Sequence, residues 1–468
     1  MIGPVPGMHN YWCAVGVMAG FRQGGGGVGL TMAEWMIDGE PSIDVWAMDF
    51  ARFGDWASPD WGTVKSCENY ERCFVMTFPN ETLPKGRRQQ TTALYDRLIA
   101  KGARMGQAFG LEHALWFADS PDDAWEDPTF ERNRSHEYVA REVKAVREAV
   151  AGIEVANFAK HLIKGPCARE WLEKNMAGYG RIALMPMLTT KGRLYGDLTV
   201  ACYDDDHFML FASGSMQDAH ARWFARTLPD NVQHINETSS WHGIALSGPL
   251  SRELLSCITR DDVSQETFKF RDTRQTYVGG VPVMLHRISF SGELGFEIYC
   301  RPQYLIRLAE SIEEAGTELG YRWYGNRTLM SLWLEKGWGA WGLEFRPDFN
   351  AIESGMDVFI NWNKDFVGKK ASLKFKQEGV ARRLVTLVID TAIDVSLNEA
   401  ILKNGNAIGY ISSGGYAHHV SKSMAMGYVE SAYALAGTLL HVEILGEFLL
   451  ATVQGAPLYD PSGHRMRR

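Results

Sequence analysis

Hydrophobic positions recur at helical spacing in three stretches of the chain. Between Val139 and Val150, valines follow one another at intervals of four, three and four residues, with charged residues on the other faces. This is the periodicity of an amphipathic helix, which we expect over His136–Val150. The segments Ala219–Leu228 and Gln303–Leu319 have a similar texture and are also predicted to be helical.

Other stretches have the shorter patterns of strands. Strands are expected within Arg181–Val200 and Val281–Cys300. Towards the C-terminus the chain becomes a series of short β-rich runs separated by Gly and Asn: Arg383–Ile389, Ala407–Ser412, Met424–Val429 and Thr438–Val453. This pattern predicts a small all-β barrel.

The N-terminal part of the chain combines a glycine-rich and an aromatic-rich stretch. We predict a strand-like run over Tyr11–Phe21, a turn over Gly24–Gly29 and a short helix over Thr31–Ile37. Three of the glycines are spaced as GxGxxG, a pattern that can hold a pyrophosphate at a helix N-terminus. No clear second and third βαβ unit follows, so we favour a tight structural turn over dinucleotide binding.

The stretch from Pro41 to Gln90 is irregular but rich in aromatic side chains. A disordered segment would not carry so many of them, which predicts a packed connector. Asp44 and Asp49 are the nearby candidates for the ribose-binding acid that a dinucleotide fold would require.

Length, charge and cysteine usage narrow the class of protein. A chain of 468 residues is too long for one core, which predicts about two to four folding units. A net charge of −8 argues against a general nucleic-acid binder. The seven cysteines are scattered without a CxxC pair, which favours reduced thiols. No secretory pattern or apolar run of about 18 residues stands out, so we expect a cytoplasmic protein without membrane or nucleic-acid partners.

Most polar clusters have a structural explanation. His418 and His419 are adjacent, and no third ligand stands at metal spacing, so no metal site is predicted. The trio Asp204–Asp206 is interpreted as a solvated turn. On the residues alone, Asp197 and Glu297 are also more often structural carboxylates, each beside an apolar strand.

Seven separated sequence blocks favour a functional role for Asp197 and Glu297. The blocks are Leu94–Arg97 (LYDR), Thr189–Val200 (TTKGRLYGDLTV), Leu246–Arg252 (LSGPLSR), Ser291–Ile298 (SGELGFEI), Leu334–Gly337 (LEKG), Phe366–Lys369 (FVGK) and Gly409–Gly414 (GYISSG). In this order they resemble the folate-binding, T-protein-like aminomethyltransferase family, in the form fused to dimethylglycine and sarcosine dehydrogenases and to dimethylglycine oxidase. Residues 1–90 resemble the C-terminal end of the flavin domain that precedes this module.

The resemblance implies a fold and a division of the chain. The implied fold is α+β, with mixed α/β modules, a small C-terminal β-barrel and an N-terminal remnant of a flavin-oxidoreductase domain. Residues 1–90 would form the remnant or connector, 91–375 the folate-binding transferase domain and 376–468 the barrel. The flavin domain itself is expected to be missing. Three explanations are open: a separate subunit supplies the flavin domain, residues 1–90 are a relic, or the start site of the chain is misjudged.

The implied activity is a tetrahydrofolate-dependent methyl or methylene transfer. Such a transferase or demethylase would act on an N-methylamine or another methylated small molecule. FAD would enter only through a flavoprotein oxidoreductase subunit, as in a dimethylglycine or sarcosine dehydrogenase-like complex. The alternative is a non-catalytic folate-binding or regulatory subunit of a flavin amine dehydrogenase.

The resemblance also assigns roles to five residues. Asp197 falls on the family's catalytic aspartate, which would orient the donor, stabilise its positive charge or move a proton. Glu297 falls on the pterin-binding glutamate, whose carboxylate can accept two hydrogen bonds from the aminopyrimidine edge. Thr199, Phe290 and Trp338 lie where related oxidases line the folate pocket, and either aromatic ring could stack on the ligand.

Some positions depart from the family pattern. Leu184 stands thirteen residues before the aspartate, where the fused oxidases have a tyrosine, and Tyr195 is a candidate substitute. Leu329 stands where simple aminomethyltransferases have a folate-binding arginine, so that role is not carried to Arg327. Trp333 replaces the usual arginine of the LRLE block. These departures bear on which amine is the substrate more than on whether the protein binds folate.

Overall fold

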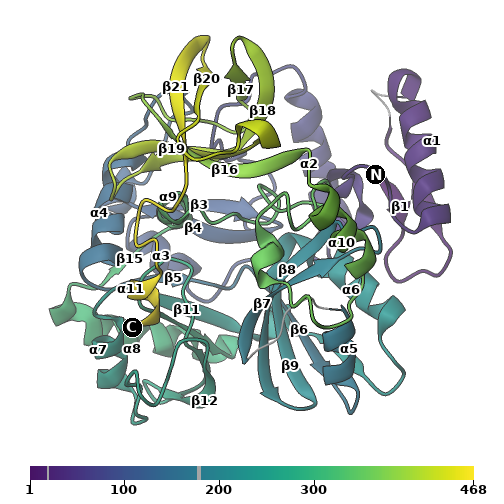
Figure 1. Cartoon of the computed structure of the whole chain (residues 1–468). Helices are drawn as coiled ribbons and strands as arrows, with labels where there is room; N and C mark the ends of the chain where they lie inside the picture. The colour runs from purple at the N-terminus through teal and green to yellow at the C-terminus, as the bar shows by residue number, and fades with distance from the viewer. Residues whose placement is uncertain (18–20, 176–180) are drawn as a thin grey trace.

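Two large sheets, a closed barrel, a β-hairpin and an N-terminal segment are the main parts of the molecule (Figure 1). The structure, a computed structural model, describes residues 1–17, 21–175 and 181–468. Helices and mostly antiparallel sheets are mixed along the chain, as the predicted α+β class requires. No helix in the described ranges is both long and apolar enough to cross a membrane.

The first sheet has five antiparallel strands in the order β10-β6-β9-β8-β7. Its elements are β6 (Phe158–Lys164), β7 (Ile182–Leu188), β8 (Leu194–Asp204), β9 (His207–Ser213) and β10 (Gln233–Asn236), covered by α5 (Ala168–Asn175) and α6 (Gln217–Thr227). Leu198 and Val200 of β8 pack under these helices with Phe224. Because side chains alternate along a strand, Asp197 and Thr199 face the opposite side. The predicted strand and helix in this region are confirmed.

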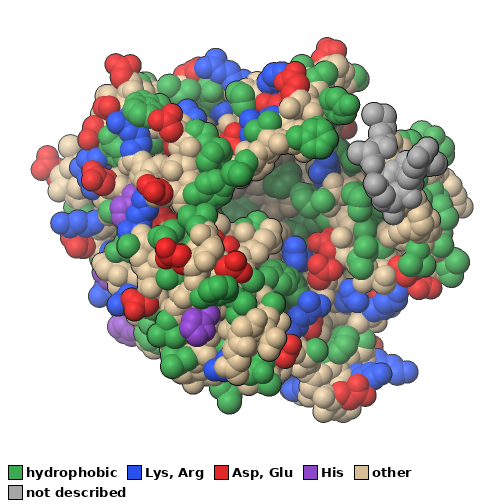
Figure 2. Space-filling model, turned by 90° about the horizontal axis from the view of Figure 1, so that it is seen from above, with side chains coloured by type: hydrophobic (Ala, Val, Ile, Leu, Met, Phe, Trp, Pro, Cys, Tyr) green, Lys and Arg blue, Asp and Glu red, His purple; other side chains and the backbone are tan. Residues whose placement is uncertain are grey.

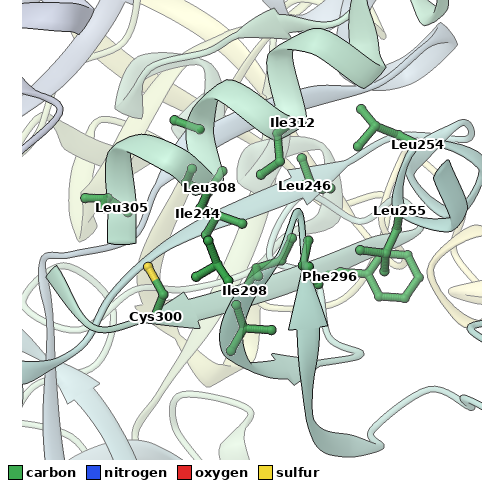
Figure 3. Close-up of a cluster of buried hydrophobic side chains, with 14 of the residues drawn as sticks. Ile244, Leu246, Leu254, Leu255, Phe296, Ile298, Cys300, Leu305, Leu308 and Ile312 are labelled. Atoms are coloured by element: carbon green, nitrogen blue, oxygen red, sulfur yellow. The ribbon is translucent and has the colours of Figure 1, made fainter. Parts of the chain in front are cut away.

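The second sheet has six strands in the order β12-β13-β14-β11-β5-β15. The strands are β5 (Ala151–Glu154), β11 (His242–Ser247), β12 (Thr273–Val278), β13 (Val281–His286), β14 (Gly295–Cys300) and β15 (Arg322–Trp323). Helices α7 (Ser251–Ile258) and α8 (Leu305–Gly316) cover one face, where Ile244, Ile298 and Leu308 are fully buried (Figure 3). Burying each such side chain contributes about 1.5–3 kcal/mol.

Helix α4 (Ser135–Glu148) joins this sheet to its neighbours, and it confirms the predicted amphipathic helix. The neighbours are α3 (Tyr95–Ala100), the hairpin β3 (Ala103–Ala108) and β4 (Leu111–Phe117), and α9 (Asn326–Lys336). The buried Glu142 of α4 accepts hydrogen bonds from the backbone N–H of Phe117 at 2.6 Å and of Gly325 at 2.8 Å, and from the Thr328 hydroxyl at 2.7 Å. One carboxylate therefore fixes α4, β4 and α9 to one another.

The predicted C-terminal barrel is confirmed. It has the strand order β16-β19-β18-β17-β20-β21, and β21 pairs back with β16. Its strands are β16 (Arg382–Ile389), β17 (Ala400–Lys403), β18 (Asn406–Ala417), β19 (Lys422–Glu430), β20 (Leu439–Ile444) and β21 (Glu447–Gln454), between α10 (Lys369–Glu378) and α11 (His464–Arg467). Closure pairs every strand on both sides and leaves no open edge.

The N-terminal segment corrects the predicted glycine turn. Gly24–Gly29 lie inside α1 (Phe21–Asp38), not in a turn before a helix. A helical glycine costs about 1 kcal/mol relative to alanine. The second half of α1 offsets this cost, because Trp35 packs against Ile2 and Val45. Of the run predicted over Tyr11–Phe21, only β2 (Trp12–Ala14) is a strand, paired with β1 (Ile2–Pro4), and residues 18–20 lie outside the described part.

The predicted connector is packed, but it contains a helix that its irregular pattern did not indicate. Helix α2 (Pro59–Glu71) begins after Ser58, whose hydroxyl accepts a hydrogen bond from the Trp61 backbone N–H. A serine cap followed by proline is a strong helix start. Trp61 also packs against Trp56, with their ring centroids 4.8 Å apart.

Candidate functional site

A cavity of about 1700 Å³ lies where the two sheets, α9 and the N-terminal segment meet. Its wall includes residues of β4, β5, β7, β8 and β14, the loop after α9, and the stretch from Ala51 to Trp56. Figure 2 shows a deep hollow with hydrophobic side chains inside it. Typical small-molecule pockets measure about 300–1,000 Å³. This cavity therefore has room for two ligands side by side.

All five predicted site residues line this one cavity. Asp197 and Thr199 come from β8, Phe290 from the loop before β14, Glu297 from β14 and Trp338 from the segment after α9. Residues that are far apart in the sequence are thus brought together by three separate parts of the fold.

Asp197 lies on an apolar part of the wall. It is opposite Pro186 in the pairing of β7 with β8, and Leu184 is opposite Thr199. Burial raises the pKa of the Asp197 carboxyl to about 7, and a hydrogen bond from its own backbone N–H offsets this only in part. At neutral pH the group therefore exists in both the protonated and the ionised form.

Tyr195 does not take the place of the missing tyrosine. It is not part of the cavity wall, and its hydroxyl donates to the Ala219 carbonyl at 3.5 Å. Leu184, by contrast, does line the cavity. A leucine at the position diagonal to Asp197 therefore stands on the cavity wall where the resemblance implies a tyrosine.

Glu297 has one engaged and one free oxygen. Its Oε2 accepts a hydrogen bond from the Tyr299 hydroxyl at 2.8 Å. Its Oε1 is enclosed and has no partner among the described residues. Burial raises the pKa of this carboxyl to about 7, while Tyr299 and the nearby Lys160 oppose the rise. A buried carboxylate oxygen without a partner is costly, so this position is suited to a ligand that donates a hydrogen bond.

Aromatic side chains form the part of the wall nearest Phe290. The ring of Phe290 stacks on that of Phe158, with centroids 5.8 Å apart. Its backbone carbonyl accepts a hydrogen bond from the Trp333 indole N–H at 2.6 Å. The tryptophan that replaces the usual arginine of the LRLE block therefore holds Phe290 in place. Flat apolar surfaces of this kind suit a planar heterocycle.

The remaining sequence candidates have structural partners. Arg327 is bound to Glu126 and does not line the cavity, whereas Leu329 does. Asp49 pairs with Arg222, and its Oδ2 lies 2.6 Å from the Arg222 guanidinium. His418, in the turn between β18 and β19, contacts Ser331 of α9. Within the described residues, no three His, Cys, Asp or Glu side chains are placed to hold a metal ion.

Sequence reasoning missed two parts of the wall. One is Glu154, which closes β5 and whose Oε1 is also enclosed without a hydrogen-bond partner among the described residues. The other is the N-terminal contribution from Ala51, Arg52, Gly54 and Trp56. For Glu154, the only signal in the sequence was a charged residue at the end of the apolar run 150–153. Nothing in the local sequence pattern indicated the N-terminal contribution.

The two sheets and the barrel around this cavity define a glycine cleavage T-protein fold. The crystal structure of glycine cleavage system aminomethyltransferase T from Bartonella henselae matches it with a TM-score of 0.70 at 23% identity, over 80% of this chain and 98% of that one. The chain belongs to the glycine cleavage T-protein family: the model of the GCVT N-terminal domain matches residues 94–364, and that of the T-protein C-terminal barrel domain matches 382–460. Residues 38–92 match the central domain of FAD dependent oxidoreductases.

Curated relatives match the whole chain or a large part of it. Human mitochondrial dimethylglycine dehydrogenase is 34% identical over 481 residues, which cover 100% of this chain and 55% of that protein. The aminomethyltransferase of Halothermothrix orenii is 28% identical over 326 residues, or 68% of this chain and 91% of the relative. The chain thus spans about half the length of the dehydrogenase that it matches.

Proposed function

We propose that this protein is a tetrahydrofolate-dependent one-carbon transferase acting on an N-methylamine or another methylated small molecule. The observation that carries the proposal is the convergence of Asp197, Thr199, Phe290, Glu297 and Trp338 on one cavity. Their side chains supply an aromatic surface, a buried hydrogen-bond acceptor and a titratable carboxyl group. These are the features that a reduced pterin and a cationic donor require together.

In this proposal Glu297 and the aromatic wall hold the pterin. The free Oε1 of Glu297 would accept a hydrogen bond from the aminopyrimidine edge, while the Tyr299 hydroxyl keeps the carboxyl in place. Phe290 and Trp338 would stack on the ring system, and Thr199 would fix its position next to Asp197. When bound, tetrahydrofolate supplies a nucleophilic nitrogen that accepts a one-carbon unit.

Asp197 is the proposed catalytic residue. With a pKa near 7, its carboxyl can hold a proton or balance the charge of a cationic donor at neutral pH. Leu184 and Leu329 line the same cavity and keep water away from a reactive donor. The chain would then orient the two reactants and control one proton. Direct transfer from an onium or methoxy donor would give 5-methyl-tetrahydrofolate, whereas 5,10-methylene-tetrahydrofolate requires a flavoprotein partner that first oxidises an N-methylamine to the iminium and takes up the two electrons.

A flavoprotein partner is the second part of the proposal. The match of residues 38–92 to an FAD dependent oxidoreductase domain supports an association with a flavin amine dehydrogenase. FAD would be contributed by that partner. The division into 1–90, 91–375 and 376–468 and the cytoplasmic location stay predictions, and the dimethylglycine dehydrogenase relative is mitochondrial.

The test is turnover with tetrahydrofolate and a panel of methylated amines, onium compounds and methoxy compounds, followed by mass detection of the folate product. Asp197→Asn should lower turnover about 10²- to 10⁴-fold and leave folate binding intact. Glu297→Gln should weaken folate binding about tenfold or more, because it replaces a charged acceptor. Asp206→Asn, in the exposed turn after β8, is the matched control and should change neither quantity.

Two results would overturn this assignment. Unchanged turnover in Asp197→Asn would remove the proposed mechanism. Folate binding without turnover of any donor, with or without a flavoprotein, would favour the non-catalytic subunit.

A further inference from the structure

A buried lysine stands behind the cavity wall on the first sheet. Lys160 of β6 is directly opposite Phe211 of β9, and Phe211 is directly opposite Thr199 of β8. Because directly opposite residues of antiparallel strands point to the same face, Lys160 is on the face that carries Asp197 and Thr199. The residue is 0% exposed. Lysine is almost never fully buried unless it is paired, so this position calls for an explanation.

The hydrogen bonds of Lys160 leave its positive charge uncompensated. Its ammonium donates to the carbonyls of Phe158 at 2.8 Å and of Ala156 at 3.2 Å. Both carbonyls belong to the stretch 155–158, which lines the cavity. They satisfy two of the three N–H donors, but they carry no net charge. The ammonium is therefore available to act on a nearby acid.

An aromatic ring connects this ammonium with Glu297. The Lys160 Nζ lies over the ring of Tyr299, 5.7 Å from its centroid. The hydroxyl of the same ring donates to Oε2 of Glu297 at 2.8 Å. The ring also packs against Phe211, with centroids 4.9 Å apart, and Phe211 is the residue opposite Lys160. Contacts between the two sheets thus hold the ammonium, the ring and the carboxyl in one buried cluster.

The other titratable groups around Glu297 are neutral near pH 7. His286 of β13 is directly opposite Glu297, and burial lowers its pKa to about 3. Burial raises the pKa of three tyrosines above the ordinary value, so they stay protonated: Tyr203, Tyr299 and Tyr324. Burial lowers the pKa of Lys160 to about 7, and Glu297 opposes this shift. Within the described residues of this cluster, the lysine and the carboxyl are the pair that changes charge around neutral pH.

Two groups outside the cluster also interact with the ammonium. His242 begins β11, and burial together with Lys160 lowers its pKa to about 4, so it is neutral at pH 6 and above. Glu154 of β5 favours the charged form of Lys160, as Glu297 does. Glu154 and Glu297 pair with consecutive residues of β11 and so project to opposite faces of the second sheet. Of the two carboxyl groups, only Glu297 therefore shares the buried cluster with Lys160.

We propose that Lys160 is a positioning residue for the pterin, which keeps the Glu297 carboxylate ionised and both of its oxygens able to accept hydrogen bonds. A protonated carboxyl turns one oxygen into a donor, which would oppose the N–H groups of the aminopyrimidine edge. A buried cation counters this strongly, because charges interact more in a protein interior than in water. Lys160 is not part of the cavity wall, so it acts without touching the ligand. This assignment rests on the proposed role of Glu297 in folate binding.

The experiment is the pH dependence of 5-formyl-tetrahydrofolate binding, measured by calorimetry between pH 6 and 9. In Lys160→Met the protonated form of Glu297 is favoured, so the rise in affinity that the wild type shows near its carboxyl pKa of about 7 should occur at a higher pH. A shift of about one unit lowers the ionised fraction at pH 7 from about a half to about a tenth, and affinity should fall about fivefold. At pH 9 Glu297 is ionised in both proteins, and the affinities should converge.

Three further variants separate the charge of Lys160 from its packing. Lys164→Met, exposed at the end of the same strand, is the matched control and should keep the wild-type profile. Lys160→Gln keeps an N–H donor for the carbonyls and should shift the profile as Lys160→Met does, which preserves the test if the methionine variant does not fold. In Glu297→Gln there is no carboxyl to titrate, so adding Lys160→Met should produce no further shift with pH.

The outcomes distinguish this assignment from the folate proposal. Failure of the wild type to bind 5-formyl-tetrahydrofolate would overturn the folate proposal and this one with it. Wild-type binding with an unshifted profile in both Lys160 variants, or with an equal loss of affinity at every pH, would overturn the role of Lys160 alone.

Discussion

Burial raises the pKa of Asp197, and one substitution should offset this rise. Among the residues that the structure describes, no side chain donates a hydrogen bond to this carboxyl, and Leu184 lies on the neighbouring strand at the diagonal position. Diagonal neighbours of an antiparallel pair are about 7–8 Å apart, which is within reach of an aromatic side chain. Leu184→Tyr would therefore bring a hydroxyl donor to the ionised carboxylate. The cavity offers room for the larger side chain.

The expected size of the effect follows from two energies. A hydrogen bond to a charged group contributes about 1.5–3 kcal/mol, and one pKa unit corresponds to about 1.36 kcal/mol. Because the new donor favours the ionised form, the pKa of Asp197 should fall from about 7 to about 5 or 6.

The pH dependence of turnover provides the assay. If the ionised carboxylate is the active form, turnover of the wild type rises with pH around 7, and in Leu184→Tyr the same rise should occur at a pH lower by about one to two units. Leu184→Phe has nearly the same bulk without the hydroxyl, and it should retain the wild-type profile. A profile that moves equally in both variants, or in neither, would refute the reasoning that links the leucine to the pKa.

Two further predictions concern the buried charges that hold the elements around the cavity. Glu142→Ala leaves two backbone N–H groups without an acceptor and should lower the free energy of unfolding by about 2–6 kcal/mol in urea denaturation; Glu137→Ala, exposed on the same helix, should change it little. Arg147→Leu leaves two buried carboxylates without their cation and should cost about 3–5 kcal/mol or more in the same measurement. For this variant the exposed Arg141→Leu is the control, and equal losses in the two would contradict the burial argument.

Periodicity predicted the elements that bury one face. The helix around Val143, the strands on either side of Asp197 and the C-terminal barrel all have an apolar face against a core, and that face is visible in the sequence. The prediction of a turn over Gly24–Gly29 was wrong. It rests on the local preference of glycine for turns, whereas the packing of Trp35 determines that this stretch is helical. Tertiary contacts of this kind leave no local signal.

The candidate site could be predicted only in part for the same reason. Asp197 and Glu297 stand in recognisable blocks, whereas Glu154 ends a short strand in a segment without any motif. The role of Trp333 was also out of reach, since its indole acts on the backbone of Phe290, 43 residues earlier in the chain. Sequence patterns indicate which residues are able to do chemistry, and the fold decides which of them meet.

The contribution of Ala51 and Trp56 to the cavity has a practical consequence. A shortened protein that starts after residue 90 would keep both sheets and the barrel, but its reaction chamber would lose one side and fill with bulk water. Engineering that treats the first 90 residues as a dispensable leader would thus open the proposed site before it damaged folding.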